Sequence, residues 1–269
     1  MAVLRCPADR QNSIKVDPAV SDLSKSFNGV ITCKNGHEFV IEENIIDLLP
    51  GQMFPGGSIA NFSNHFSLTA LSYEEQWRKR SIGWLSGQDF TLQDEADLLL
   101  NWIGDYSKKV VIDIGASTGF YSRTVASTHP DSEIYAIDFS RPMLKETVKK
   151  AAAEKRRLFA LRADVTRLPF FDDSADLALC GGTYNELYDP ETSMKQIFRV
   201  LNPGGVCFIM YLTKAQSYAG RMFQLGLRTG GVSFPKRSKV ENQFTKCGFD
   251  ILKTRTVGIV TFQLLQKTA

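Results

Sequence analysis

Three aspartates stand at the ends of apolar runs and are the residues of this chain best suited to hold a polar ligand. "VVIDI" contains Asp113, "EIYAID" ends in Asp138 and "LFALRAD" ends in Asp164. A carboxylate placed like Asp138 can accept hydrogen bonds from both hydroxyls of a ribose. One placed like Asp164 can accept from the amino group of adenine, while the Val165 amide addresses the ring. The three acids predict a nucleoside, although each could instead only cap the helix that follows it.

The turn "GASTGF", which follows the first of these acids, narrows the kind of ligand. Gly115 and Gly119 would let the backbone approach a ligand closely, and the amides that open the next helix would face it. A dinucleotide-binding turn would have glycines at 115, 117 and 120, but here Ser117 and Phe120 occupy the last two positions. A Walker-type phosphate loop is excluded because no lysine follows the second glycine. The turn therefore suits a nucleoside without a phosphate.

Alternating strands and helices must position these residues. The strand-like runs after residue 109 are "VVIDI", "EIYAID", "LFALRAD", "DLALC", "VCFIMYL" and "VTFQLL". The helical stretches between them are "YSRTVAST", "RPMLKETVKKAAAEK" and "ETSMKQIFRVL". Short apolar runs that alternate with helices are typical of a parallel sheet covered on both faces. We therefore predict an α/β fold with a Rossmann-like, doubly wound, mostly parallel sheet, which binds ligands at the carboxyl ends of its strands.

The composition along the chain predicts three parts. Residues 1–50 contain "GVITC", "HEFVIEE" and "IIDLLP", which predict a small β unit. Residues 51–108 begin with the Gly- and Pro-rich "GQMFPGGSIANFSN" and end with the helical "DEADLLLNWI", so we expect a linker and a helical lid. Residues 109–269 form the ligand-binding domain.

Overall composition restricts the class of protein only loosely. A net charge of +3 argues neither for nor against nucleic acid. The five cysteines are odd in number and scattered, so we expect no disulfide framework and a reducing, cytoplasmic location. No apolar run approaches the roughly 18 residues that a membrane span needs, so we expect no membrane partner. The oligomeric state stays open.

Five segments together resemble the motifs of class I S-adenosylmethionine-dependent methyltransferases, in that family's order. They are "VIDIGASTGFYSR", "YAIDFSRPML", "LRADVTRLPF", "DDSADLALC" and "RVLNPGG", which fall within residues 109–211. The resemblance implies a seven-stranded sheet, methyltransferase activity and S-adenosylmethionine as the cofactor. The implied cofactor-binding residues are Asp113, Gly115, Ala116 and Gly119 around the methionine part, Asp138 at the ribose, Phe139 and Met143 beside the adenine, Asp164 and Val165 at its amino edge, and Gly181.

One position departs from the family pattern. Ser117 stands where the family usually has glycine. The serine is tolerated if its φ is negative, and its hydroxyl could then contact the cofactor.

The acceptor of the methyl group is expected near "CGGTYNELYDP", because the corresponding segment of methyltransferases borders the transferable methyl. Tyr184, Asn185 and Glu186 are therefore candidates for contact with the acceptor, with Tyr184 and Glu186 as candidate catalytic residues. Asn185 and Glu186 could instead only open the next helix. His65 is a third catalytic candidate over the pocket, although its apolar neighbours also suit a packed histidine.

The segment "YEEQWRKRSIGWLSGQDFTLQDE" resembles part of a chloroplast and cyanobacterial group of methyltransferases. That resemblance implies that Tyr73 and Arg78 contact the cofactor, with Arg78 bound to its carboxylate. The alternative is an exposed basic helix face.

The N-terminal segments "LRCPAD", "ITCKNGHEF" and "IIDLLP" look like the zinc ribbon of a ribosomal RNA guanine methyltransferase. A closed zinc site needs four ligands in two close pairs. This chain offers Cys6, Cys33 and His37, but Asp9 stands where the second cysteine should be. We therefore expect a degenerate, zinc-free ribbon and no metal ligand.

These features predict methyl transfer from S-adenosylmethionine to a small, apolar or aromatic metabolite. An apolar wall for that acceptor could come from Tyr218, Met222, Phe223 and Leu227, or these residues could belong to an ordinary helix that packs on the sheet. An RNA base methyltransferase is the first alternative, with the mild charge and the lack of an Asn-Pro-Pro-Tyr motif against it. A binding or activator protein and a cyclase that keeps the cofactor are the others.

Overall fold

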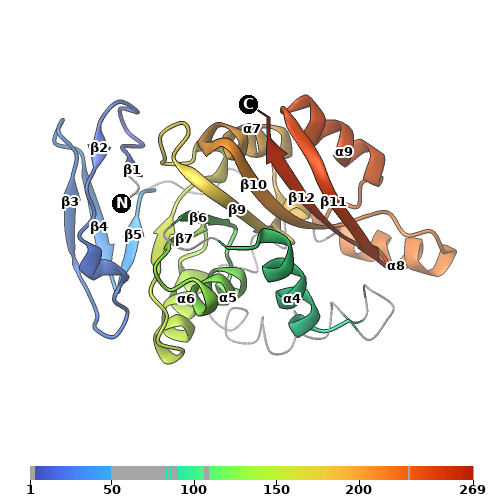
Figure 1. Ribbon diagram of the computed structural model, residues 1–269, viewed down its shortest axis with the longest axis horizontal. Coiled ribbons are helices and arrows are strands. Elements are labelled where there is room, and N and C mark those ends of the chain that lie inside the picture. The colour runs from blue at the N-terminus through green and yellow to red at the C-terminus, as the bar shows by residue number, and fades with distance from the viewer. Residues whose placement is uncertain are drawn as a thin grey trace.

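A ten-stranded sheet runs through the molecule (Figure 1). The computed structural model describes residues 4–49, 83, 85, 90–105, 109–229 and 231–268. Its strands are β1 (Leu4–Arg5), β2 (Ser13–Ile14), β3 (Gly29–Thr32), β4 (Glu38–Glu42), β5 (Ile45–Asp47), β6 (Val110–Ile114), β7 (Glu133–Asp138), β8 (Phe159–Arg162), β9 (Ala175–Gly181), β10 (Leu201–Leu212), β11 (Phe249–Val257) and β12 (Val260–Lys267). The strand order in the large sheet is β11-β12-β10-β9-β6-β7-β8-β5-β4-β3, and β1 pairs with β2 separately.

Helices cover both faces of this sheet. They are α4 (Leu92–Ile103), α5 (Phe120–Thr128), α6 (Arg141–Ala153), α7 (Pro190–Val200), α8 (Tyr218–Thr229) and α9 (Arg237–Lys246), with short 3-10 helices η1 (Pro18–Ser21), η3 (Val165–Arg167) and η4 (Thr183–Glu186). In Figure 1, α4, α5 and α6 lie below the sheet, and α7 and α9 lie above it. Strands β8, β7, β6, β9 and β10 are mutually parallel neighbours, which confirms the predicted mostly parallel α/β fold.

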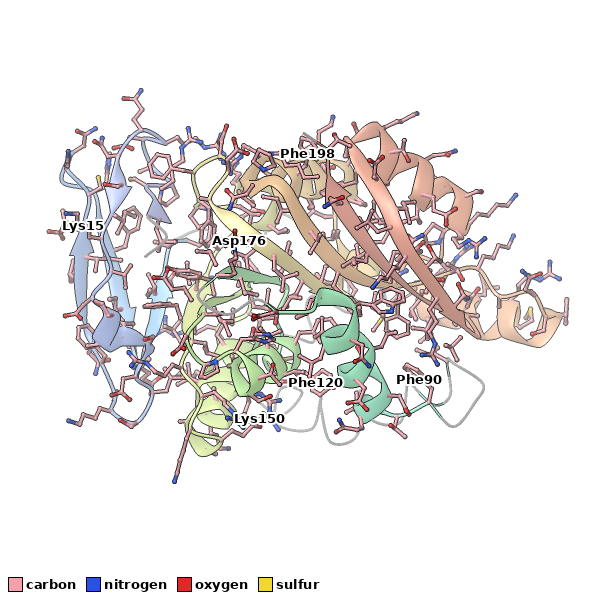
Figure 2. The ribbon with its side chains drawn as sticks, viewed as in Figure 1. Lys15, Phe90, Phe120, Lys150, Asp176 and Phe198 are labelled. Carbon is pink, nitrogen blue, oxygen red and sulfur yellow. The ribbon has the colours of Figure 1, made fainter. Side chains whose placement is uncertain are left out.

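Each face of the sheet packs its own apolar cluster. Along β6, Ile112 and Ile114 belong to the cluster shared with α7 and α9, whereas Val111 belongs to the cluster shared with α4, α5 and α6. This alternation follows from the two-residue period of a strand. On the α7 face, Phe198 packs against Phe249 of β11 with ring centroids 5.2 Å apart, and Phe198 is labelled at the top of Figure 2. Because both faces are covered, the central strands are continuous apolar runs.

Helix caps place the loops at the carboxyl ends of the strands. Ser140 caps α6, with its hydroxyl accepting from the Met143 amide, and a proline follows in the first turn. Asp189 caps α7 in the same way by accepting from the Thr192 amide at 3.0 Å. These caps end the loops after β7 and β9 sharply, so the residues just past each strand stay near the sheet edge.

The N-terminal strands extend the large sheet. β5 pairs in parallel with β8, with Ile45 opposite Ala160, and β4 and β3 follow as an antiparallel edge. Ion pairs reinforce the junction, because Asp47 lies 2.9 Å from Arg162 and the Arg141 guanidinium pairs with Glu42. The division of the chain at residues 50 and 108 stays a prediction.

A search of the described residues for a helix both long and apolar enough to cross a membrane finds none.

Candidate functional site

A cavity opens at the carboxyl ends of β6, β7, β8 and β9. Nine predicted site residues line it, namely Gly115, Ser117, Asp138, Phe139, Met143, Asp164, Val165, Gly181 and Glu186. The remaining lining residues are Ile137, Ala163, Gly182, Thr183, Leu187 and Tyr188. The parallel register of the strands brings these separate segments to one edge, as the strand-end rule predicts. The cavity is the candidate ligand site.

The loop after β6 is fastened to the loop after β9. Gly115 has a φ of 62° and its carbonyl accepts a hydrogen bond from the Thr183 hydroxyl at 2.9 Å. A Cβ atom at Gly115 would clash with the Thr183 side chain. Glycine is therefore required at 115 by both backbone conformation and contact. Thr183 is not among the site residues predicted from the sequence, and its place in "CGGTYNEL" is the one local signal that points to it.

The negative φ on which tolerance of Ser117 was predicted to depend is not observed. Its φ is 52°, in the left-handed region that the family's glycine would adopt easily. Two hydrogen bonds compensate for the unfavourable conformation. The Ser117 amide donates to Asp138 at 2.7 Å, and its carbonyl accepts from the Thr147 hydroxyl at 2.7 Å. The Ser117 hydroxyl lies 3.5 Å from the Met143 sulfur, at the cavity wall.

The Asp138 carboxylate joins two loops and still borders the cavity. One oxygen accepts from the Ser117 amide and the other from the Ser140 amide, each at 2.7 Å. Burial raises the pKa of Asp138, and the amides of Ser140, Ser117 and Phe139 oppose that effect by stabilising the ionised form. A carboxylate has about four acceptor sites. With these three amides bound, at least one site stays available for a hydroxyl donor on a ligand.

Asp164 is also held by its neighbours. The Thr166 amide and hydroxyl donate to one carboxylate oxygen at 2.8 and 2.7 Å, so Asp164 caps the short helix η3. The Tyr188 hydroxyl lies 3.3 and 3.2 Å from the two oxygens. Burial, together with this nearby carboxylate, raises the pKa of Tyr188. Tyr188 was not predicted as a site residue, because only the folded chain brings the loops after β8 and β9 together.

Phe139 is supported from the N-terminal strands. The Arg162 guanidinium lies over the Phe139 ring, 5.5 Å from its centroid, and donates to the Phe139 carbonyl at 3.1 Å. Asp47 of β5 accepts from the same guanidinium at 2.9 Å. The chain of contacts from Asp47 through Arg162 thus orients a wall of the cavity. No local sequence signal connects residues 115 positions apart.

Three predicted residues lie behind the cavity wall. Asp113 is buried, and its carboxylate accepts from the Ser122 amide and hydroxyl at 3.0 and 2.6 Å. Ala116 and Gly119 are also buried, and the Gly119 amide donates to the Ala116 carbonyl at 2.8 Å. In this geometry Asp113 holds the first turn of α5 and so shapes the loop. Its predicted contact with the cofactor stays a prediction.

The expectation for Tyr184 needs correction. Its ring is buried between Tyr211 and Phe244, and its hydroxyl donates to Gln243 of α9 at 2.8 Å. Burial raises its pKa, which keeps the phenol neutral. Tyr184 therefore belongs to the core and does not border the cavity. The Tyr184 side chain points into the core because consecutive residues of the 3-10 helix η4 point to different sides of that helix.

The neighbouring candidates differ in the same way. Asn185 is buried and bonds through its amide to Leu212 and Ser233, so it fastens the end of β10 and does not contact an acceptor. Glu186 lines the cavity. Of the three residues proposed from "TYNE", the structure places only Glu186 in the site.

The predicted apolar wall on α8 does not line the described cavity. Tyr218 and Met222 are 76% and 52% exposed, and Leu227 is half-buried. The Phe223 side chain lies outside the described residues, as do His65, Tyr73 and Arg78.

The cavity fits a cationic nucleoside cofactor such as S-adenosylmethionine. Three carboxylates, from Asp138, Asp164 and Glu186, line it, and no lysine or arginine is found among its described lining residues. This charge suits a sulfonium cation and disfavours a phosphate. The side chains of Phe139, Met143 and Val165 provide apolar contacts for a flat ring. When bound, this cofactor supplies an activated methyl group.

Comparison with known proteins gives a consistent result. A family model described as "Methyltransferase domain" matches residues 112–209. A demethylmenaquinone methyltransferase of Lactococcus lactis is 28% identical over 55% of this chain and 68% of its own length. A chloroplastic 2-methyl-6-phytyl-1,4-hydroquinone methyltransferase of Oryza sativa is 27% identical over 57% of this chain and 42% of its own. This chain thus spans between 40% and 68% of the length of the first curated relatives it matches.

A solved structure supports the fold. The phosphoethanolamine N-methyltransferase 2 of Haemonchus contortus, in complex with S-adenosyl-L-methionine, superposes with a TM-score of 0.64. The alignment covers 80% of this chain and 62% of that protein at 16% identity. At this identity the likeness concerns the fold alone.

Proposed function

This chain carries a class I S-adenosylmethionine-dependent methyltransferase domain, and we propose that it uses this domain to methylate an aromatic, hydroquinone-like small molecule. The observation that carries the proposal is the cavity at the strand ends, lined by three carboxylates and, among its described residues, by no cation. That lining suits the sulfonium cofactor and offers, among its described residues, no cationic partner for a phosphate on the acceptor.

The relatives support the class of acceptor. The names of the Lactococcus and Oryza proteins specify a demethylmenaquinone and a phytyl hydroquinone, both of which have an aromatic or quinonoid ring. In this chain the wall beyond Gly181 continues through Gly182, Leu187 and Tyr188. A small, mixed apolar and aromatic surface of this kind accommodates a ring more readily than a strongly charged group.

The reaction breaks the bond between sulfur and the methyl carbon and forms a bond between that carbon and the acceptor. S-adenosylhomocysteine leaves, and the acceptor loses one proton. In-line displacement of this kind depends mostly on alignment of the two reacting atoms. We assign to Glu186 the role of accepting the proton, because it is an acidic residue that lines the cavity on the side of the loop after β9.

Transfer of a labelled methyl group tests the activity. The protein is incubated with labelled S-adenosylmethionine and, in parallel, with substituted hydroquinones, a small-molecule extract and total RNA. Label is expected in a hydroquinone or in an extracted aromatic product, with a mass increase of one methyl group. Label in RNA alone would refute the proposed acceptor class. Label in no acceptor, with no S-adenosylhomocysteine formed, would refute methyl transfer itself.

A matched pair of variants tests the role of Glu186. Glu186→Gln is expected to lower kcat by about a hundredfold, in the range typical of a lost general base, and to leave the Kd for S-adenosylhomocysteine within about threefold. Glu191→Gln is the control, because Glu191 is exposed on α7, outside the cavity, and pairs with Lys195 at 2.6 Å on the same helix. An unchanged kcat in Glu186→Gln would remove Glu186 from the reaction.

A further inference from the structure

Four side chains that can bind a metal converge in the N-terminal strands. They are Cys6, Asp9, Cys33 and His37, and their ligand atoms all lie within 4.8 Å of one another. Cys6 and Cys33 are buried free thiols. None of the four lines the candidate methyltransferase cavity. Sequence alone led us to expect a zinc-free ribbon because Asp9 replaces a cysteine, so the position of its carboxylate decides the question.

We propose that Cys6, Asp9, Cys33 and His37 form a closed, four-coordinate site for one zinc ion, with the Asp9 carboxylate as the fourth ligand. Zinc bonds of about 2.3 Å to sulfur and about 2.0 Å to nitrogen or oxygen, in a tetrahedron, place sulfur about 3.5 Å from nitrogen or oxygen, and nitrogen about 3.3 Å from oxygen. These separations provide a geometric test of the cluster.

Four of the six separations between the ligand atoms agree with a tetrahedron, and the other two, from the Cys6 sulfur to Cys33 and to Asp9, are within 4.8 Å. The Nδ1 atom of His37 lies 3.7 Å from the Cys6 sulfur and 3.3 Å from the Cys33 sulfur. An Asp9 oxygen lies 3.7 Å from the Cys33 sulfur and 3.4 Å from the same His37 nitrogen. Each value is within a few tenths of an ångström of the distance that a shared zinc ion would impose.

The Asp9 carboxylate is oriented independently of the thiols. One oxygen accepts from the Gln11 and Asn12 amides at 2.9 and 3.0 Å. The other, which faces Cys33 and His37, accepts from the side-chain amides of Asn12 and Asn35, each at 3.0 Å. Hydrogen bonds of this kind fix the direction of a metal-binding carboxylate.

The donor set selects zinc and a structural role. Two thiolates favour zinc over magnesium or calcium, which prefer oxygen ligands. Four protein ligands leave no open position for water or substrate, so the ion stabilises the fold and performs no catalysis. Cys6 follows β1, which is anchored by the Arg5 amide to the Pro169 carbonyl at 2.9 Å. Cys33 and His37 lie in the turn between β3 and β4, so zinc would join this hairpin to the N-terminal segment.

Metal content tests the site directly. The full chain is purified under reducing conditions without added metal or chelator and analysed for metals. We expect about one zinc per chain, loss of zinc in Cys33→Ser and His37→Gln, and retention in the control Cys247→Ser, whose buried thiol lies outside the cluster. Folded, reduced protein that contains no zinc above background, and takes none up from a zinc buffer, would overturn the proposal.

Two further measurements separate a lost ligand from a lost fold. Asp9→Cys should keep one zinc. Asp9→Asn should bind zinc at least about tenfold more weakly in competition with a chromophoric chelator. Asn35→Ala should weaken zinc binding to the same extent, because it removes a hydrogen bond to Asp9. Cobalt bound in place of zinc should show thiolate charge-transfer absorption and the visible bands of a tetrahedral ion. Equal affinity in Asp9→Asn and the natural protein would exclude Asp9 as a ligand.

Hydrogen exchange tests the structural role. Removal of zinc by a chelator should raise exchange in residues 29–42 and leave β6 unchanged. If β3 and β4 exchange equally in the zinc-bound and zinc-free protein, the ion does not stabilise the hairpin.

Discussion

The backbone amide of Ser117 donates a 2.7 Å hydrogen bond to the carboxylate of Asp138, so the turn after β6 is held by the end of β7. This bond keeps a non-glycine residue at a φ of 52°. It also orients the carboxylate toward the cavity that both residues line. The acid proposed to bind the ribose therefore shapes the cofactor loop as well.

Asp138→Asn should weaken the binding of S-adenosylhomocysteine about ten- to a hundredfold. Loss of the charge removes hydrogen bonds worth roughly 1.5–3 kcal/mol to the ribose hydroxyls. Isothermal titration calorimetry measures the affinity. Asp131→Asn is the control, because Asp131 is exposed and precedes the N-terminal end of β7, whereas Asp138 lies at its carboxyl end. The same Kd in both variants would remove Asp138 from the cofactor site.

Asp47→Asn should weaken the same ligand about three- to tenfold, because it loosens Arg162 and hence the Phe139 wall. The loss of a charged hydrogen bond two contacts away from the ligand costs less than the loss of a direct one. Glu38→Gln on β4 is the control, since Glu38 is exposed. The affinity and the stability to urea unfolding are measured for both variants. A lower stability with unchanged affinity would show that Asp47 supports only the sheet.

Gly115→Ala should destabilise the protein by about 2–4 kcal/mol, because the new Cβ meets both a positive φ and the Thr183 side chain. Gly104→Ala measures the cost of the positive φ alone, without a clash. Gly104 has a φ of 75°, and a Cβ atom added there would have no neighbour within 4 Å, so about 1 kcal/mol is expected. Urea unfolding measures both changes. In a Thr183→Ala background the cost of Gly115→Ala should fall, and strict additivity would contradict the predicted clash.

Stability should fall above about pH 10, where unfolded tyrosines ionise. Burial raises the pKa of Tyr135, Tyr184 and Tyr211 in the folded protein. The contribution of these tyrosines to the free energy of unfolding is fully present below their pKa in the unfolded chain. It is lost as the pH rises toward their pKa in the folded protein, at about 1.4 kcal/mol per pH unit for each tyrosine. Urea midpoints at pH 8 and pH 10.5 give the slope. Tyr135→Phe should reduce it, whereas Tyr218→Phe, at a 76% exposed ring, is the control. Equal slopes in the natural protein and Tyr135→Phe would contradict this prediction.

Sequence patterns predicted the central strands because buried parallel strands are continuous apolar runs. The residues at the carboxyl ends of these strands predicted the site. The runs that contain Asp113, Asp138 and Asp164 all became neighbouring strands. β11 was not predicted. It is an edge strand with five consecutive exposed residues and an irregular register between Ile251 and Lys253, so its pattern lacks the expected alternation.

Local patterns thus determined which segments are strands and which strand ends carry acids, because burial on both faces and helix capping act over a few residues. Tertiary structure alone decided where each side chain points. It turned Tyr184 into the core and left Glu186 at the cavity, although they are two residues apart. It also brought Asp47 to Arg162, Tyr188 to Asp164, and Asp9 to Cys33 and His37. These pairs join segments that are distant along the chain, and their proximity results from sheet register and loop packing, which no single segment encodes.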